Sequence, residues 1–117
     1  MTVQVDVWLR GSDSAITEAI SGIVREPNEW SEDDVRRVLE GMLQAMHRLR
    51  HPGDGERPVF LRGLSWIVNP YDEGGVVIAI EIAAGAAVAG PFQIDQSVLE
   101  TMIERVLVRP VPSTTVH

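Results

Sequence analysis

One carboxylate stands inside the most apolar part of the chain. Glu81 interrupts the run from Val76 to Ala83, whose other members are valine, isoleucine and alanine. A charged group on such a segment needs a partner or water, because burying it alone is costly. The sequence therefore offers Glu81 as a carboxylate that binds a cationic group or transfers a proton. The alternative is an edge-strand charge, or one side of an ion pair with an arginine such as Arg62.

Three further residues join Glu81 and Arg62 as ligand or interface candidates. Ser65 offers a hydroxyl, Tyr71 a phenol within a turn, and Trp8 a large ring at a polar strand position. Trp8 is either covered by a loop or neighbouring strand or exposed as a stacking or interface residue. A catalytic serine needs a positioned base, but no G-x-S-x-G motif surrounds Ser65 and lysine is absent. We therefore predict no catalytic residue.

Two other spacings suggest chemistry but favour structural explanations. His47 and His51 stand four residues apart, which places both on one helix face. Arginines flank them and no third ligand is evident, so we predict that they complement the negative helix end and bind no metal. Asp6 and Glu81 would form a carboxylate pair only if the first strand pairs with residues 76–83.

Composition and charge narrow the class of protein. The 117 residues suit one domain, which we place at residues 1–109, with residues 110–117 as a mobile tail. A formal net charge of −7 argues against nucleic-acid binding. The absence of cysteine excludes disulfides and thiol chemistry and fits the cytoplasm. No apolar run reaches the roughly 20 residues that a membrane helix needs, and we expect no cofactor.

The strongest local signal is a hairpin between Pro58 and Ala83. Strand-forming residues flank a turn that contains proline, asparagine and glycine. Pairing Val68 with Val76 gives one apolar face, made of Leu64, Trp66, Val68, Val76, Ile78, Ile80 and Ile82. The opposite face carries Leu61, Gly63, Ser65, Ile67, Val77, Ala79, Glu81 and Ala83. This second face is too apolar for an ordinary solvated surface.

Helical spacing of apolar residues predicts two helices before the hairpin. The first begins near Ser12 and closes at Pro27. The second has Ser31 as its N-cap, and the acidic residues that follow fill its positive first turn. Trp30 and Val35 have the spacing of a hydrophobic staple at this helix start.

The remaining segments complete the expected architecture. Alternation from Val3 to Leu9 predicts a half-buried strand, and the small residues from Ala84 to Pro91 predict an extended segment. Asp95 or Ser97 caps a last helix. The order β-α-α-β-β-(β)-α predicts an α+β two-layer sandwich. In it, three helices cover one face of a mostly antiparallel sheet of three to four strands.

The uncovered face of this sheet suggests a function. Its predicted interface residues are Leu61, Gly63, Ile67, Val77, Ala79 and Ala83. Monomers rarely expose large apolar patches, so the first hypothesis is a non-enzymatic protein-interaction module that forms a homodimer. The alternative is a small-molecule-binding domain or minor enzyme with Glu81 in a shallow pocket. A third hypothesis is an immunity-like or inhibitor protein whose acidic surface binds a basic partner.

Overall fold

The computed structural model of the protein describes residues 2–53 and 59–108. It is an α+β fold whose elements are β1 (Val3–Leu9), β2 (Ile16–Ile20), a 3-10 helix (Pro27–Glu29), α1 (Glu32–Arg50), β3 (Ser65–Pro70), β4 (Val76–Ile82), β5 (Gly85–Phe92) and α2 (Gln96–Val108). The strands form one antiparallel sheet in the order β2-β1-β5-β4-β3. The last strand of the chain is therefore the central strand of the sheet.

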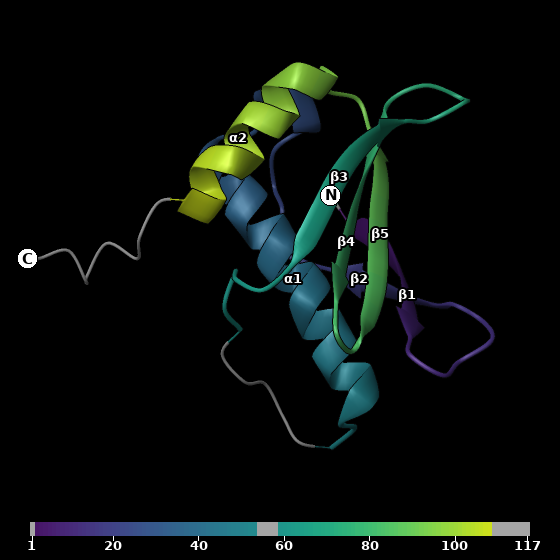
Figure 1. Cartoon of the computed structure of the whole chain (residues 1–117). Helices are drawn as coiled ribbons and strands as arrows, with labels where there is room; N and C mark the ends of the chain where they lie inside the picture. The colour runs from purple at the N-terminus through teal and green to yellow at the C-terminus, as the bar shows by residue number, and fades with distance from the viewer. Residues whose placement is uncertain (1, 54–58, 109–117) are drawn as a thin grey trace, which may run out of the picture.

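Both α-helices lie on the same face of the sheet (Figure 1). This arrangement confirms the predicted α+β class and antiparallel sheet. The predicted numbers were wrong, because the described residues contain a five-stranded sheet and two α-helices. The observed order of strands and α-helices is β-β-α-β-β-β-α.

The segment predicted as the first helix contains a strand instead. β2 pairs antiparallel with β1 and turns Ile16, Glu18 and Ile20 toward the helices. The backbone groups at the edge of β1 need hydrogen-bond partners, and β2 supplies them. The β-branched residues Ile16, Thr17 and Ile20 also favour a strand over a short helix. Gly22 follows the strand with φ near +88°, a conformation that does not continue either a strand or a helix.

The hairpin of β3 and β4 exists with a different register from the predicted one. Val68 pairs with Ile78, not with Val76, because β3 runs on to Pro70 and shortens the turn. A slip of two residues leaves every side chain on its original face. The predicted division into a core face and a second face is therefore correct within β3 and β4.

The small residues after β4 form the central strand β5, which confirms the predicted extended segment. Ala87 and Ala89 are fully buried on the side that faces α1. Gly85 pairs with Leu9 of β1, and a Cβ atom added to it would collide with the carbonyl oxygen of Trp8. Small side chains here let the two neighbouring strands and the helix layer approach closely.

The start of α1 is built as predicted. Ser31 is the N-cap, and its backbone N–H donates to Asp34 Oδ2 at 2.9 Å while its hydroxyl accepts from the Asp34 N–H. This reciprocal pair is a capping box. Trp30 and Val35 are both buried, as a hydrophobic staple requires. Arg25 adds an ion pair to the same Asp34 oxygen at 3.6 Å.

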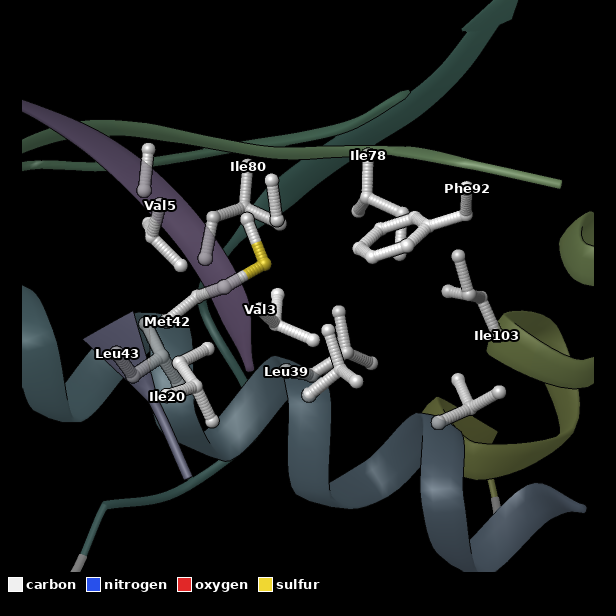
Figure 2. Close-up of a cluster of buried hydrophobic side chains, with 14 of the residues drawn as sticks. Val3, Val5, Ile20, Leu39, Met42, Leu43, Ile78, Ile80, Phe92 and Ile103 are labelled. Atoms are coloured by element: carbon white, nitrogen blue, oxygen red, sulfur yellow. The ribbon is translucent and has the colours of Figure 1, made fainter. Parts of the chain in front are cut away.

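The hydrophobic core fills the space between the sheet and the two helices (Figure 2). The residues labelled there are Val3, Val5, Ile20, Ile78, Ile80 and Phe92 from the strands, Leu39, Met42 and Leu43 from α1, and Ile103 from α2. Phe92 also meets the ring of Trp30 edge to face, with 4.8 Å between the ring centroids. The core therefore stabilises one face of the sheet only.

The start of α2 decides between the two predicted caps in favour of Asp95. Its Oδ2 accepts hydrogen bonds from the Ser97 hydroxyl at 2.6 Å and from the backbone N–H groups of Ser97 and Val98. The Ser97 hydroxyl lowers the pKa of Asp95 most, followed by the N–H of Val98. Ser97 thus donates to the cap and is not the cap itself.

We expect the Asp95 cap to make stability depend on acid pH. A carboxyl group whose pKa is lowered by folding stabilises the protein above its unfolded pKa of 3.8, and this contribution is lost as pH falls through the lower folded pKa. Asp95→Asn keeps an acceptor but does not titrate. Urea midpoints measured from neutral pH to pH about 3 should show a wild-type advantage that shrinks in acid. A difference independent of pH would contradict the assigned hydrogen bonds.

Candidate functional site

The face of the sheet opposite the helices is the candidate functional site, and we call it the open face. The strand registers place these side chains on it: Gln4, Asp6, Trp8, Thr17, Ala19, Ser65, Ile67, Asn69, Val77, Ala79, Glu81, Ala86 and Val88. No α-helix of the described residues covers this face (Figure 1). A second molecule could therefore contact the sheet on this face.

Cross-strand pairing arranges the open face in rows. One row crosses four strands and consists of Trp8, Ala86, Glu81 and Ser65. The next row crosses five strands and consists of Thr17, Asp6, Val88, Ala79 and Ile67. The rows lie about 7 Å apart along the strands. Three of the predicted ligand candidates, Glu81, Ser65 and Trp8, are thus brought into a single row.

An apolar strip runs across the centre of the open face. Ile67 on β3 is 52% exposed, and Trp8 on β1 is 39% exposed. Ala79 and Val88 continue the row of Ile67, and Ala86 pairs with Trp8 in the adjacent row; all three are half-buried. A tryptophan side chain is seldom this exposed. The exposure agrees with the alternative in which Trp8 is open to solvent and not with the one in which a loop or strand covers it.

Glu81 lies beside an open depression in this face. The depression has a volume of about 420 Å³ and is lined by Ser65, Trp66, Ile67, Ala79, Ile80, Glu81 and Ala86. Two of these lining residues are alanines, whose small side chains leave room beside the Glu81 carboxylate. Glu81 itself is exposed and sits directly across from Ser65. The carboxylate therefore remains accessible to water and to any approaching cation.

The carboxylates Asp6 and Glu81 do not form a catalytic pair. The premise that β1 pairs with β4 was wrong, because β5 lies between them. Two strand spacings and one row offset separate their Cα atoms by about 12 Å. Asp6 instead accepts a hydrogen bond from Thr17 Oγ1 at 2.7 Å.

The other predicted site residues lie away from the centre of the open face. Tyr71 is exposed in the turn between β3 and β4. Leu61 precedes β3 and packs against the core. Arg62, Gly63 and Ala83 line a second cavity at the C-terminal end of α1. The first strand of the hairpin begins at Ser65, later than predicted, so Leu61 and Gly63 are not part of it. Of the six predicted interface residues, only Ile67, Val77 and Ala79 lie on the open face.

Several open-face residues were missed by the sequence prediction. Thr17 and Ala19 were assigned to a helix, while Ala86 and Val88 had no assigned neighbours. The one available signal was Trp8, whose place among the polar positions of β1 marks this face as partly apolar. The strand order, which the sequence does not display, joins these residues to Glu81.

The His47 and His51 rings lie with their centroids 4.9 Å apart at the end of α1. Within residues 2–53 and 59–108, no group of three or more histidine or acidic side chains is placed to hold a metal ion. None of the helices in those ranges is long and apolar enough to cross a membrane. Comparisons with protein-family models, curated proteins and solved structures give no match.

Proposed function

We propose that the protein is a non-enzymatic interaction module that self-associates through its open face. The observation that carries this proposal is the one-sided placement of both α-helices, which leaves the apolar strip from Trp8 to Ile67 uncovered in the described structure. Contiguous apolar patches on protein surfaces mark interaction sites. Most homo-oligomers are two-fold dimers with self-complementary patches, so we infer a dimer in which open face meets open face.

The dimensions of the sheet support a dimer of this kind. Five strands about 4.8 Å apart and about 20 Å long present a face of roughly 500 Å² in projection. Side-chain relief and the flanking turns bring this area toward the roughly 800 Å² per partner of a standard interface. Ala79 and Ala86 permit the close approach of a second sheet. We expect Glu81 at the rim of the interface, where its charge stays hydrated.

Substituting Ala79 tests this proposal. Ala79→Arg places a long cation at the centre of the face, where a facing copy of the protein would leave no water to solvate it. We expect this variant to be monomeric by light scattering at micromolar concentration. Val24→Arg is the matched control, because Val24 is 77% exposed and lies outside the sheet. It should keep the wild-type mass. A dimer that survives Ala79→Arg unchanged would exclude the open face as its interface.

The depression beside Glu81 favours a second candidate function, the binding of a small cationic molecule. A charged carboxylate next to Ser65 and small apolar residues could hold an ammonium group against a partly apolar floor. Glu81→Gln should then abolish binding of a simple alkylammonium probe and leave the mass of the protein unchanged. Equal binding of the probe by both forms would remove this candidate. A basic protein partner and a cytoplasmic location remain predictions from composition.

A further inference from the structure

A second and larger cavity lies at the C-terminal end of α1, and none of the residues that line it belongs to the open-face rows. Its volume is about 750 Å³, within the range of 300–1,000 Å³ that is typical of small-ligand sites. Three parts of the chain line it: α1, residues 59–63, and the end of β4 with the turn that follows it. Leu43, Met46 and Ile82 contribute an apolar surface, and Leu43 and Met46 are buried members of the core.

The ionisable side chains that line this cavity, among the residues that the structure describes, belong to arginine and histidine. Arg50 and Arg62 line it and are exposed, and His47 lies beside them. None of the described residues that line it is acidic, although the chain has 17 acidic and 10 basic residues. Among the described residues, neither Arg50 nor Arg62 forms a salt bridge with a carboxylate. Arg62 instead lies over the ring of Phe60, with its guanidinium 5.9 Å from the ring centroid.

We propose that this cavity binds a single-chain amphiphile with an anionic head group. The alkyl chain would lie against Leu43, Met46 and Ile82, where it replaces water on apolar surface. The head group would lie between Arg50 and Arg62, because a guanidinium binds carboxylate and phosphate oxygens with paired hydrogen bonds. A neutral apolar ligand would form no ion pair with Arg50 or Arg62. An anion without an alkyl chain would leave the apolar surface in contact with water.

The fold holds one wall of this cavity in place. The backbone N–H of Arg10 donates to the Ala84 carbonyl at 2.9 Å, and its Nε donates to the Ala83 carbonyl at 2.7 Å. These bonds fix the β4–β5 turn against the end of β1. The negative end of α1 opposes an anion, but basic residues in its last turn, Arg50 included, offset that field. A preformed wall lowers the ordering cost of binding.

Calorimetric titration of the full chain with decanoate tests the proposal. We expect saturable binding of decanoate and of decyl phosphate, since the two share a single alkyl chain and an anionic head. Whichever binds more tightly identifies the natural head group as carboxylate or phosphate. Decanol, which lacks the charge, and acetate, which lacks the tail, should each bind at least about tenfold more weakly. Equal affinity for decanoate and decanol, or no decanoate binding at millimolar concentration, would overturn the proposal.

Substitutions locate the binding within the cavity. The double variant Arg50→Gln and Arg62→Gln should weaken decanoate binding about tenfold and leave decanol binding unchanged. Ala83→Phe should block the cavity without removing a charge, because Ala83 is exposed and lines the cavity. Arg37→Gln, an exposed position of α1 outside the cavity, is the matched control and should bind like wild type. Thermal unfolding checks that each variant is folded.

Decanoate binding in this cavity does not depend on self-association through the open face. Ala79→Arg should bind decanoate with wild-type affinity even if it is monomeric, because Ala79 does not line this cavity. Wild-type affinity in the double arginine variant would place the amphiphile elsewhere and overturn the assignment. Decanoate affinity lost in Ala79→Arg but kept in the double arginine variant would place the ligand on the open face and would also overturn it.

Discussion

Leu39→Ala is expected to lower the free energy of unfolding by about 2–5 kcal/mol. Leu39 is fully buried in the middle of α1, at the place where this helix meets the sheet (Figure 2). Truncation removes apolar contacts and leaves a cavity that a rigid sheet cannot close. With a urea dependence of about 1–3 kcal/mol per molar, the midpoint should fall by roughly 1–3 M.

Leu39→Met is the control for this substitution, because it conserves volume and should cost less than about 1.5 kcal/mol. The measurement is equilibrium urea unfolding at one fixed protein concentration, since association also contributes to stability. A Leu39→Ala variant as stable as Leu39→Met would contradict the position of α1 over the sheet.

Gly85→Ala is the second change with a large expected effect, a loss of about 3 kcal/mol or more. The added methyl group would meet the carbonyl oxygen of Trp8 and lie 3.0 Å from the Cα of Leu9. These are backbone atoms of the paired strand β1, so no side-chain rotation relieves the collision. The pairing of β1 with β5 must open, and it is this pairing that joins the β1–β2 hairpin to the rest of the sheet.

Gly22→Ala separates this collision from ordinary glycine effects. Gly22 has φ near +88° with nothing within 4 Å of an added Cβ atom. Its replacement should therefore cost only the backbone strain of an alanine at positive φ, about 1–2 kcal/mol. Thermal and urea unfolding of the two variants give the comparison. A Gly85→Ala variant at least as stable as Gly22→Ala would show that β1 and β5 are not in contact at this point.

The sequence predicted those features that local residue patterns determine. The start of α1 follows from Ser31 and its acidic neighbours, and the structure contains the N-cap at that residue. The two faces of β3 and β4 follow from strict alternation, which survives the two-residue error in register. The small residues of β5 indicated an extended segment, since glycine and proline disfavour a helix there.

The features that were missed depend on contacts between distant parts of the chain. Residues 16–20 fit either a helical or a strand pattern, and the free edge of β1 decides between them. The open face depends on the position of β5 between β1 and β4, which no local pattern encodes. The cavity at the end of α1 is formed by α1, residues 59–63, the end of β4 and the turn that follows it. Only the folded structure shows that Arg50 and Arg62 share it.

The solution mass of the wild-type protein shows whether it self-associates through the open face. Sedimentation equilibrium over a series of micromolar concentrations measures this mass without reference to shape. We expect a species with twice the 12.9 kDa of one chain. A mass of 12.9 kDa at every concentration would contradict it.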